Sequence, residues 1–181
     1  MKTFFLFLGC LLATTAIAAQ GTFTLTSKDI GGQFSTMQEF DGFGCGGQNK
    51  SPQLSWKNAP ENTKSFAVTM YDPDAPTGSG FWHWLVFDIP ANVNELVTGA
   101  GNTALGLAPE GAVQSITNYG AKGFGGPCPP EGHGIHQYII TVHALGTDKL
   151  GPNENTNPAV VGFNLWGQTL AKASIVAYYK R

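Results

Sequence analysis

The sequence has little charge, few cysteines and no second long apolar run. Only 12% of its 181 residues are Asp, Glu, Lys or Arg, whereas about a quarter is usual in soluble proteins. This scarcity excludes a fold dominated by charged helices, and an apolar content of 42% excludes a disordered chain. Lys and Arg form no cluster, so nucleic acid is not an expected partner.

The one long apolar run lies near the start of the sequence and is typical of a secretory signal peptide. Lys2 supplies a positive charge, residues 4–12 are apolar, and residues 16–18 form a small-x-small cleavage site. The run is shorter than the roughly 20 residues of a membrane-spanning helix, so we expect no integral membrane anchor. The sequence therefore predicts a cleaved signal peptide over 1–18 and a protein in the periplasm or secreted.

Removing this segment also removes Cys10 and leaves two of the three cysteines, Cys45 and Cys128. In an oxidising compartment, two remaining cysteines predict one disulfide, worth about 2 to 5 kcal/mol. A zinc pair is the alternative, but neither cysteine has a second one in CxxC spacing. Both lie in loops rich in Gly or Pro, residues 42–47 and 125–130.

The remaining chain, 19–181, is predicted to be mainly β and to form one domain. Its 24 Gly and 11 Pro favour turns, and its β-branched and aromatic residues recur with period two. An apolar run that begins with Pro158 at helical spacing predicts a helix. The expected strands are 22–27, 64–71, 81–89, 136–145 and 174–179, and the expected helix is 158–173.

The segment 81–87 is apolar on both faces, which predicts a strand covered on each side. His83 within it should be buried or should line a pocket. Residues 99–134 have many Gly and Pro and little periodicity, so we expect long structured loops there.

Two motifs place chemically active residues at strand ends. The first, residues 72–76 (Asp-Pro-Asp-Ala-Pro), follows a strand, and its prolines end that strand in a rigid turn. The second, residues 129–138, leads into another strand, where His136 and Tyr138 share a parity and His143 has the opposite one. His136 and Tyr138 should therefore face one side of the sheet and His143 the other.

If these motifs converge, three chemistries could use them. Imidazole, phenol and backbone N–H groups could bind an anion. His and Asp could hold a hydrolytic metal, although no HExxH-type pair is present. A nucleophilic hydrolase is the least favoured, because there is no GxSxG elbow. The residues alone rank anion binding first and a metal site second, and our leading hypothesis is a non-enzymatic site without a cofactor or metal.

In combination, these motifs resemble the phosphatidylethanolamine-binding protein family, also called Raf kinase inhibitor-like proteins. The resemblance covers nearly all of the chain after the signal, and the signal itself with three further segments resembles the bacterial periplasmic branch, the YbcL-type proteins. The family motifs are residues 72–76, 82–84 (Trp-His-Trp) and 134–138 (Gly-Ile-His-Gln-Tyr), and the branch motifs are 42–45, 51–56 and 128–130.

The resemblance implies a β-sandwich, with a large central sheet against a smaller one and a few peripheral helices. It also implies a small cavity for phosphate or a phospholipid head group such as phosphorylethanolamine. Carried over by motif, the ligand-binding residues are Asp72, Asp74, Pro76, His83, Pro130, His136 and Tyr138.

Gln137 stands where eukaryotic members usually carry Arg, so one fixed positive charge is missing and tight phospholipid binding is not implied. The alternative function is a protein-interaction or inhibitor module that acts on a protease, a kinase pathway or a host protein. A metal-dependent hydrolase ranks third. The family also implies a homodimer.

Overall fold

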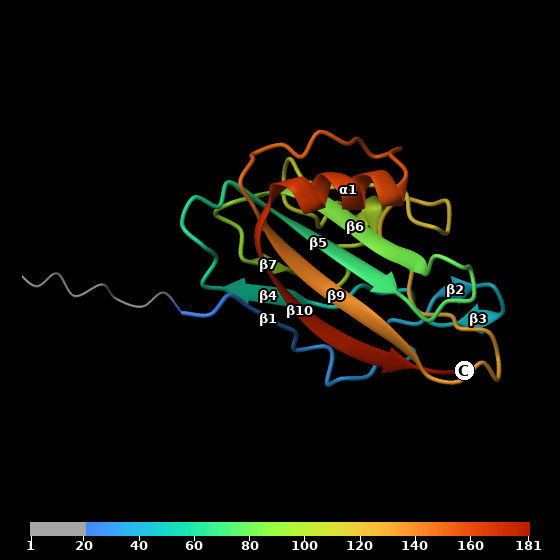
Figure 1. The fold of residues 1–181 in the computed structure, drawn as a ribbon. Coiled ribbons are helices and arrows are strands. Elements are labelled where there is room, and N and C mark those ends of the chain that lie inside the picture. Colours follow the sequence, from blue (N-terminus) through green and yellow to red (C-terminus); the bar gives the residue numbers. More distant parts are fainter. Residues whose placement is uncertain (1–20) are drawn as a thin grey trace, which may run out of the picture.

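The computed structural model describes residues 21–181 and contains two antiparallel sheets that form a sandwich (Figure 1). The predicted signal peptide lies outside the described residues. One sheet has five strands in the order β10-β9-β5-β6-β8, another has three in the order β1-β4-β7, and β2 pairs with β3. The strands are β1 Thr24–Thr26, β2 Asp41–Gly42, β3 Cys45–Gly46, β4 Leu54–Lys57, β5 Ser65–Asp72, β6 Phe81–Pro90, β7 Glu95–Leu96, β8 Val113–Gln114, β9 His136–Leu145 and β10 Thr169–Tyr179.

The main core lies between the two sheets. Alternate residues of β5 and β9 point toward the small sheet, as the period of two requires. Trp56 of β4 packs against Phe66 of β5 with ring centroids 5.3 Å apart. The small sheet thus covers one face of the large sheet.

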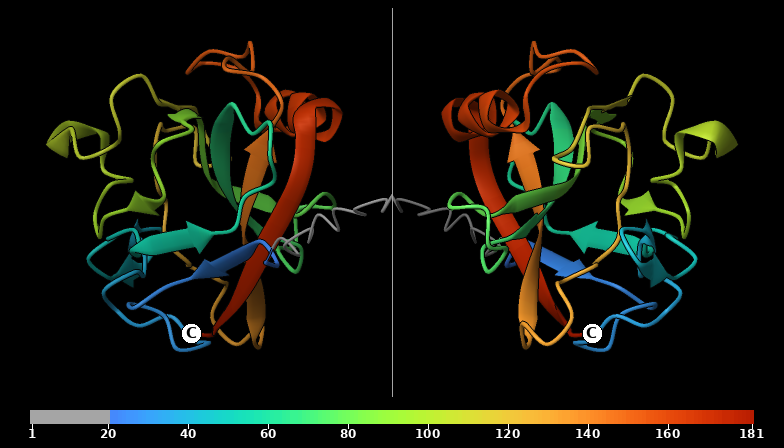
Figure 2. Two further views of the ribbon diagram at one scale, coloured as in Figure 1. Left: turned by 90° about the vertical axis from the view of Figure 1, so that its left-hand side faces the viewer. Right: turned by 90° about the vertical axis from the view of Figure 1, so that its right-hand side faces the viewer.

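The other face of the large sheet is covered in part by the helix α1, Pro158–Gln168. Val161 and Leu165 of α1 pack with Leu85, Phe87 and Leu145 of the sheet. In both views of Figure 2, α1 lies at the top of the molecule and β1 and β4 lie lower. No helix among residues 21–181 combines the length and the apolar character that a membrane span needs.

The β-sandwich and the long strands were predicted correctly. The strand predicted over 136–145 has the same bounds as β9. The strand predicted over 64–71 is displaced by one residue, to Ser65–Asp72, and the one predicted over 81–89 extends one residue further, to Pro90. The strand predicted over 22–27 is shorter, and the strand predicted over 174–179 begins earlier, at Thr169. β6 is buried along most of its length, as its two apolar faces indicated.

The helix prediction over 158–173 was too long. Asn157 caps the first turn by accepting a hydrogen bond from the N–H of Ala159, and Pro158 takes the first helical position. Thr169 has extended backbone angles and pairs with Leu145, and after a register shift β10 continues its ladder with β9 from Ala171. The ladder hydrogen bonds of β9 therefore end the helix, although the apolar spacing continues.

The helical part of the sandwich is small. Within residues 21–181 it consists of α1 and one short 3-10 helix, Thr103–Leu105. The strands β4 and β7 of the small sheet were not predicted, because two to four residues are too few for a visible period. The remainder of 99–134 forms loops, apart from the two-residue β8.

The predicted disulfide joins Cys45 to Cys128, whose Cα atoms are 6.0 Å apart. It connects the β2–β3 hairpin to the loop that precedes β9, across 83 residues of sequence. Arg181 lies against the same bond, with Nη1 3.2 Å from Sγ of Cys45. Two loops without regular pairing to each other are thereby held together.

The double variant Cys45→Ser/Cys128→Ser should lower the free energy of unfolding by about 2 to 5 kcal/mol, because the unfolded chain regains loop entropy. Urea denaturation of the purified protein, with reductant-treated wild type as the matched control, measures this loss. An unchanged unfolding curve in both samples would show that the bond contributes nothing.

Candidate functional site

A cavity of about 200 Å³ lies where β5 ends and β6 and β9 begin. The disulfide-linked loops close it on the remaining side. Its lining consists of Phe43, Asp72, Ala75, Pro76, Thr77, Phe81, His83, Tyr119, Cys128, Pro129, Pro130, His136 and Tyr138. Both sequence motifs therefore converge on one small space, mostly walled by aromatic and proline side chains.

His83 reaches the cavity because of a β-bulge in β6. Met70 of β5 lies opposite Trp84, and the next residue, Tyr71, lies opposite Trp82, which leaves His83 as the extra residue. A bulge changes the direction in which side chains point and often occurs beside functional sites. Here it brings His83 to within 5.1 Å of the Tyr138 ring, measured between centroids.

The His83 ring is held by the backbone of a glycine-rich loop. Nδ1 lies 2.8 Å from the carbonyl oxygen of Gly125 and 3.2 Å from that of Gly126. Since carbonyl oxygens only accept, Nδ1 carries the proton and Nε2 keeps a free lone pair. Complete burial lowers the pKa of His83 to about 4, against the opposing effects of these carbonyls and Asp72, so the ring is neutral at pH 7.

A second imidazole belongs to a chain of hydrogen bonds. His136 donates from Nδ1 to the Asp72 carboxylate at 2.7 Å, and both side chains are almost fully buried. The Nε2 atom of His136 lies 2.7 Å from Nδ1 of His133, which is exposed. The second oxygen of Asp72 accepts from the N–H of Asp74 at 2.8 Å, so the carboxylate is well satisfied.

The Tyr138 hydroxyl is different, because it is buried and has no hydrogen-bond partner among the described residues. Burial first, and the nearby Asp72 carboxylate second, raise the pKa of Tyr138. The phenol therefore keeps its proton and offers it as a donor. A buried donor without a partner costs about 1 to 3 kcal/mol, which a ligand oxygen in the cavity would recover.

Six of the seven residues proposed from the motifs line the cavity, and Asp74 does not. Its carboxylate accepts from the N–H of Gln137 at 2.9 Å and so joins the turn after β5 to the start of β9. Gln137 itself is also absent from the lining. Asp74 and Gln137 hold the two motifs together rather than facing the cavity.

Sequence reasoning missed Tyr119 and His133. Tyr119 donates to the Gly126 carbonyl at 2.8 Å and stacks on Phe40, with centroids 4.1 Å apart. Tyr119 lies within residues 99–134, where the hydrophobic pattern of the sequence has no clear period from which its position could be predicted. His133 was within the second motif, but its contact with His136 depends on the turn between them.

No Lys or Arg lines the cavity within residues 21–181, and its one carboxylate belongs to Asp72. The charged group that comes near it is Arg181, whose guanidinium contacts the loop carrying Phe43 at 3.5 Å. The cavity can thus donate hydrogen bonds to a small group but offers it little positive charge.

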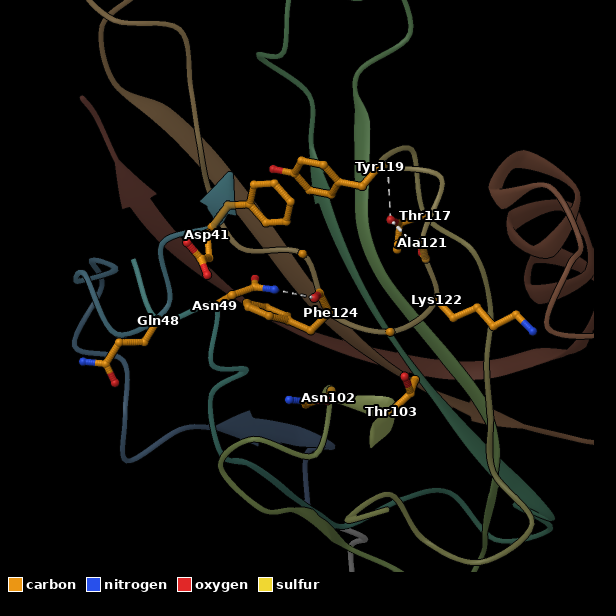
Figure 3. Close-up of a pocket in the computed structure, with 14 residues that line it drawn as sticks. Asp41, Gln48, Asn49, Asn102, Thr103, Thr117, Tyr119, Ala121, Lys122 and Phe124 are labelled. Carbon is orange, nitrogen blue, oxygen red and sulfur yellow. Dashed lines mark hydrogen bonds between the residues drawn. The ribbon is translucent and has the colours of Figure 1, made fainter. Parts of the chain in front are cut away.

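A second cavity of about 360 Å³ shares Tyr119 with the first one (Figure 3). Its polar side chains are largely used within the protein. Asn49 donates to the carbonyl of Phe124 at 3.3 Å and accepts from the N–H of Gly126 at 2.7 Å. These bonds hold the glycine-rich loop against His83, so we assign this cavity a supporting role.

The class of this protein is defined by two features, a two-sheet β-sandwich and a small cavity that two histidines and two tyrosines line. A family model described as phosphatidylethanolamine-binding protein matches residues 28–180. The protein YbcL of Escherichia coli (strain K12) is 47% identical over 183 residues, which cover 99% of this chain and 99% of YbcL. YbhB of the same organism is 44% identical over 157 residues, which cover 86% of this chain and 98% of YbhB.

The fold agrees with these identities. The crystal structure of E. coli YbcL, described as a member of the mammalian PEBP family, matches this chain with a TM-score of 0.86 and 48% identity. The match covers 90% of this chain and 99% of that one. The chain belongs to the phosphatidylethanolamine-binding protein family, and the resemblance to its YbcL type is confirmed.

The buried neutral His83 makes stability depend on pH. Its pKa is about 4 in the folded protein, against 6.5 for a histidine exposed to water, so the unfolded chain binds a proton more readily. The stability is fully present above pH 6.5 and is lost as the pH falls toward 4, by up to about 3 kcal/mol for this group. Urea denaturation at pH 7, 5.5 and 4 should show this decrease.

His83→Gln, which cannot become charged, should show a shallower dependence on pH than wild type. His133→Gln is the matched control, because His133 is exposed. Parallel pH profiles for all three proteins would show that His83 is not the group responsible.

Proposed function

We propose that this protein is an exported, non-enzymatic binding protein whose cavity takes a small anion, either free phosphate or a phosphorylethanolamine-type head group. The observation that carries the proposal is the buried Tyr138 hydroxyl, which has no partner among the described residues and lies in a cavity with two imidazoles. The family description, phosphatidylethanolamine-binding protein, supports the same ligand class.

The charges determine which form of the ligand fits. Tyr138 donates a hydrogen bond to a ligand oxygen, whereas neutral His83 accepts one at Nε2. A phosphate group that keeps one proton satisfies both groups, because it carries an acceptor oxygen and an O–H donor. The Asp72 carboxylate disfavours further negative charge, so binding should tighten as the pH falls and phosphate gains protons.

His133 controls access to the second imidazole. Its Nδ1 lies 2.7 Å from Nε2 of His136, and this hydrogen bond keeps Nε2 from contacting a ligand. Because His133 is exposed on a turn flanked by Gly132 and Gly134, both with positive φ, it can be displaced by a ligand without disturbing the core. Nε2 of His136, whose Nδ1 donates to Asp72, is then free to accept a hydrogen bond from an O–H of the ligand.

Export is supported by the predicted signal peptide and by the disulfide, which persists in oxidising compartments. Osmotic-shock fractionation of expressing cells, with N-terminal sequencing of the released protein, tests it. A cytoplasmic protein that retains residues 1–18 would contradict this part of the proposal.

A protein-interaction or inhibitor role is the second candidate, and one observation favours it. Phe43, in the cavity lining, is 73% exposed, and Ile135 is 65% exposed. Exposed apolar side chains beside a cavity are typical of docking sites for a partner protein.

The homodimer expected from the family stays a prediction, and a light-scattering mass of one chain would contradict it.

A metal-dependent hydrolase has no such support. No three His, Cys, Asp or Glu side chains within residues 21–181 lie together as ligands for a metal ion.

Titration of the mature protein with phosphate and with phosphorylethanolamine should give saturable shifts of the His83 and His136 imidazole resonances. Tyr138→Phe should weaken binding about tenfold, because one buried hydrogen bond worth about 1.4 kcal/mol is lost. Its unfolding free energy should stay equal or rise, since the variant removes a buried hydroxyl without a partner.

Tyr71→Phe is the matched control, because the Tyr71 hydroxyl donates to the carbonyl of Ser79 outside the cavity. It should bind the anion as wild type does. Absence of any shift at millimolar ligand would contradict anion binding and favour the protein-interaction role. Tighter binding of phosphorylethanolamine than of phosphate would identify a head group as the ligand.

A further inference from the structure

A separate groove of about 460 Å³ lies on the opposite face of the large sheet, between α1 and the strands β9 and β10. His143 lines it, and its parity on β9 is opposite to that of His136 and Tyr138 in the cavity. The volume lies within the range of about 300 to 1,000 Å³ that is typical of ligand pockets. No residue of the proposed anion site lines it.

The walls of the groove are apolar and unusually exposed. Trp166 of α1 lines the groove and is 82% exposed, and Phe163, which lies outside the lining, stacks beside it with 71% exposure. Trp82 forms part of the floor, and Gly162 of α1 lies so close that a Cβ atom there would be 3.4 Å from the Trp82 ring. Exposed aromatic side chains gathered at a groove are typical of a binding surface, whereas single exposed apolar residues are not.

One end of the groove is polar. The hydroxyl of Thr169 donates to the Leu165 carbonyl at 2.6 Å, so it can only accept from Nδ1 of His143, which lies 3.1 Å away. The Nε2 atom of His143 therefore carries a lone pair and has no hydrogen-bond partner among the described residues. Burial, and then Lys172, lower the pKa of His143 to about 4.

The positive charge at this end is not balanced by the protein. Lys172 lies directly opposite His143 in the β9–β10 ladder, where side chains on one face approach to about 5 Å. It has no ion pair within residues 21–181. The three elements α1, β9 and β10 contain no Asp or Glu at all, so no acid on them competes for the ammonium group.

We propose that this groove binds an amphipathic carboxylate, a molecule with an apolar chain and one carboxyl head group. The chain packs against Trp82, Trp166 and Leu170, which stabilises it by about 25 cal/mol for each Å² of apolar surface buried. The carboxyl group takes up one proton from solvent on binding, donates that O–H to Nε2 of His143 and accepts a hydrogen bond from Lys172. Neither a multiply charged anion nor a cation finds matching charges there.

Decanoate at concentrations below micelle formation is the probe. Binding should shift the tryptophan emission to the blue and protect Trp166 from acrylamide quenching, with one saturable site measured by calorimetry. Lys172→Glu should weaken decanoate binding about tenfold or more, equivalent to about 1.4 kcal/mol, and leave binding of the uncharged 1-decanol unchanged. Trp166→Ala should weaken the binding of both.

Two matched controls accompany these variants. Lys57→Glu reverses a charge on the exposed end of β4, and Leu105→Ala removes an exposed apolar side chain from the 3-10 helix, both remote from the groove. Both should bind decanoate as wild type does. The side chains of Trp166 and Lys172 are exposed, so their loss should not prevent folding.

The proposal is overturned if decanoate gives no saturable response, if Lys172→Glu binds it as tightly as wild type, or if decyltrimethylammonium binds equally well. If the protein instead forms a dimer that persists in the presence of decanoate, and Trp166→Ala abolishes this dimer, the groove is the contact surface for a second copy of the chain. Tyr138→Phe should leave decanoate binding unchanged, so failure of the anion cavity and failure of the groove can be distinguished.

Discussion

The hydrogen bond between the Asp72 carboxylate and Nδ1 of His136 holds the candidate site together. The ladder between β5 and β9 ends at Tyr71 and Ile139, and beyond this point the two strands separate. The bond of 2.7 Å crosses the resulting gap, and the N–H of Asp74 satisfies the other carboxylate oxygen. Removing one partner would leave a buried group uncompensated at a cost of about 3 to 5 kcal/mol. The cavity therefore exists because the strand ends are kept apart and yet remain joined.

The loops complete what the strands begin. The disulfide places Phe43 and Cys128 on the open side of the cavity, and the glycine-rich loop orients His83 through two carbonyl groups. A Cβ atom at Gly126 would come within 1.8 Å of the Gln38 carbonyl, so this close approach of two backbones requires glycine. The many glycines that made the middle of the sequence hard to interpret are thus part of the wall of the site.

The two faces of the large sheet each carry a buried histidine in the same state. His83 and His143 are each neutral and each donate from Nδ1 to the protein, which leaves Nε2 for a ligand. On the enclosed side, Tyr138 adds a donor and the space suits a small polar group. On the side of α1, tryptophan side chains and Lys172 add apolar surface and one positive charge. The alternation of side chains along β9 separates the two environments.

The sequence by itself determined the long strands, the cysteine pair and the two motifs, because these depend on a period of two, on counting and on local turn chemistry. It also indicated that His136 and Tyr138 face one way and His143 the other. The family resemblance already placed His83 with them, but only the tertiary structure gives the physical reason, since the bulge in β6 is visible only when its register against β5 is known. Tyr119, the end of α1 and the role of Asp74 were likewise decided by contacts between distant segments, which a single sequence does not encode in any local pattern.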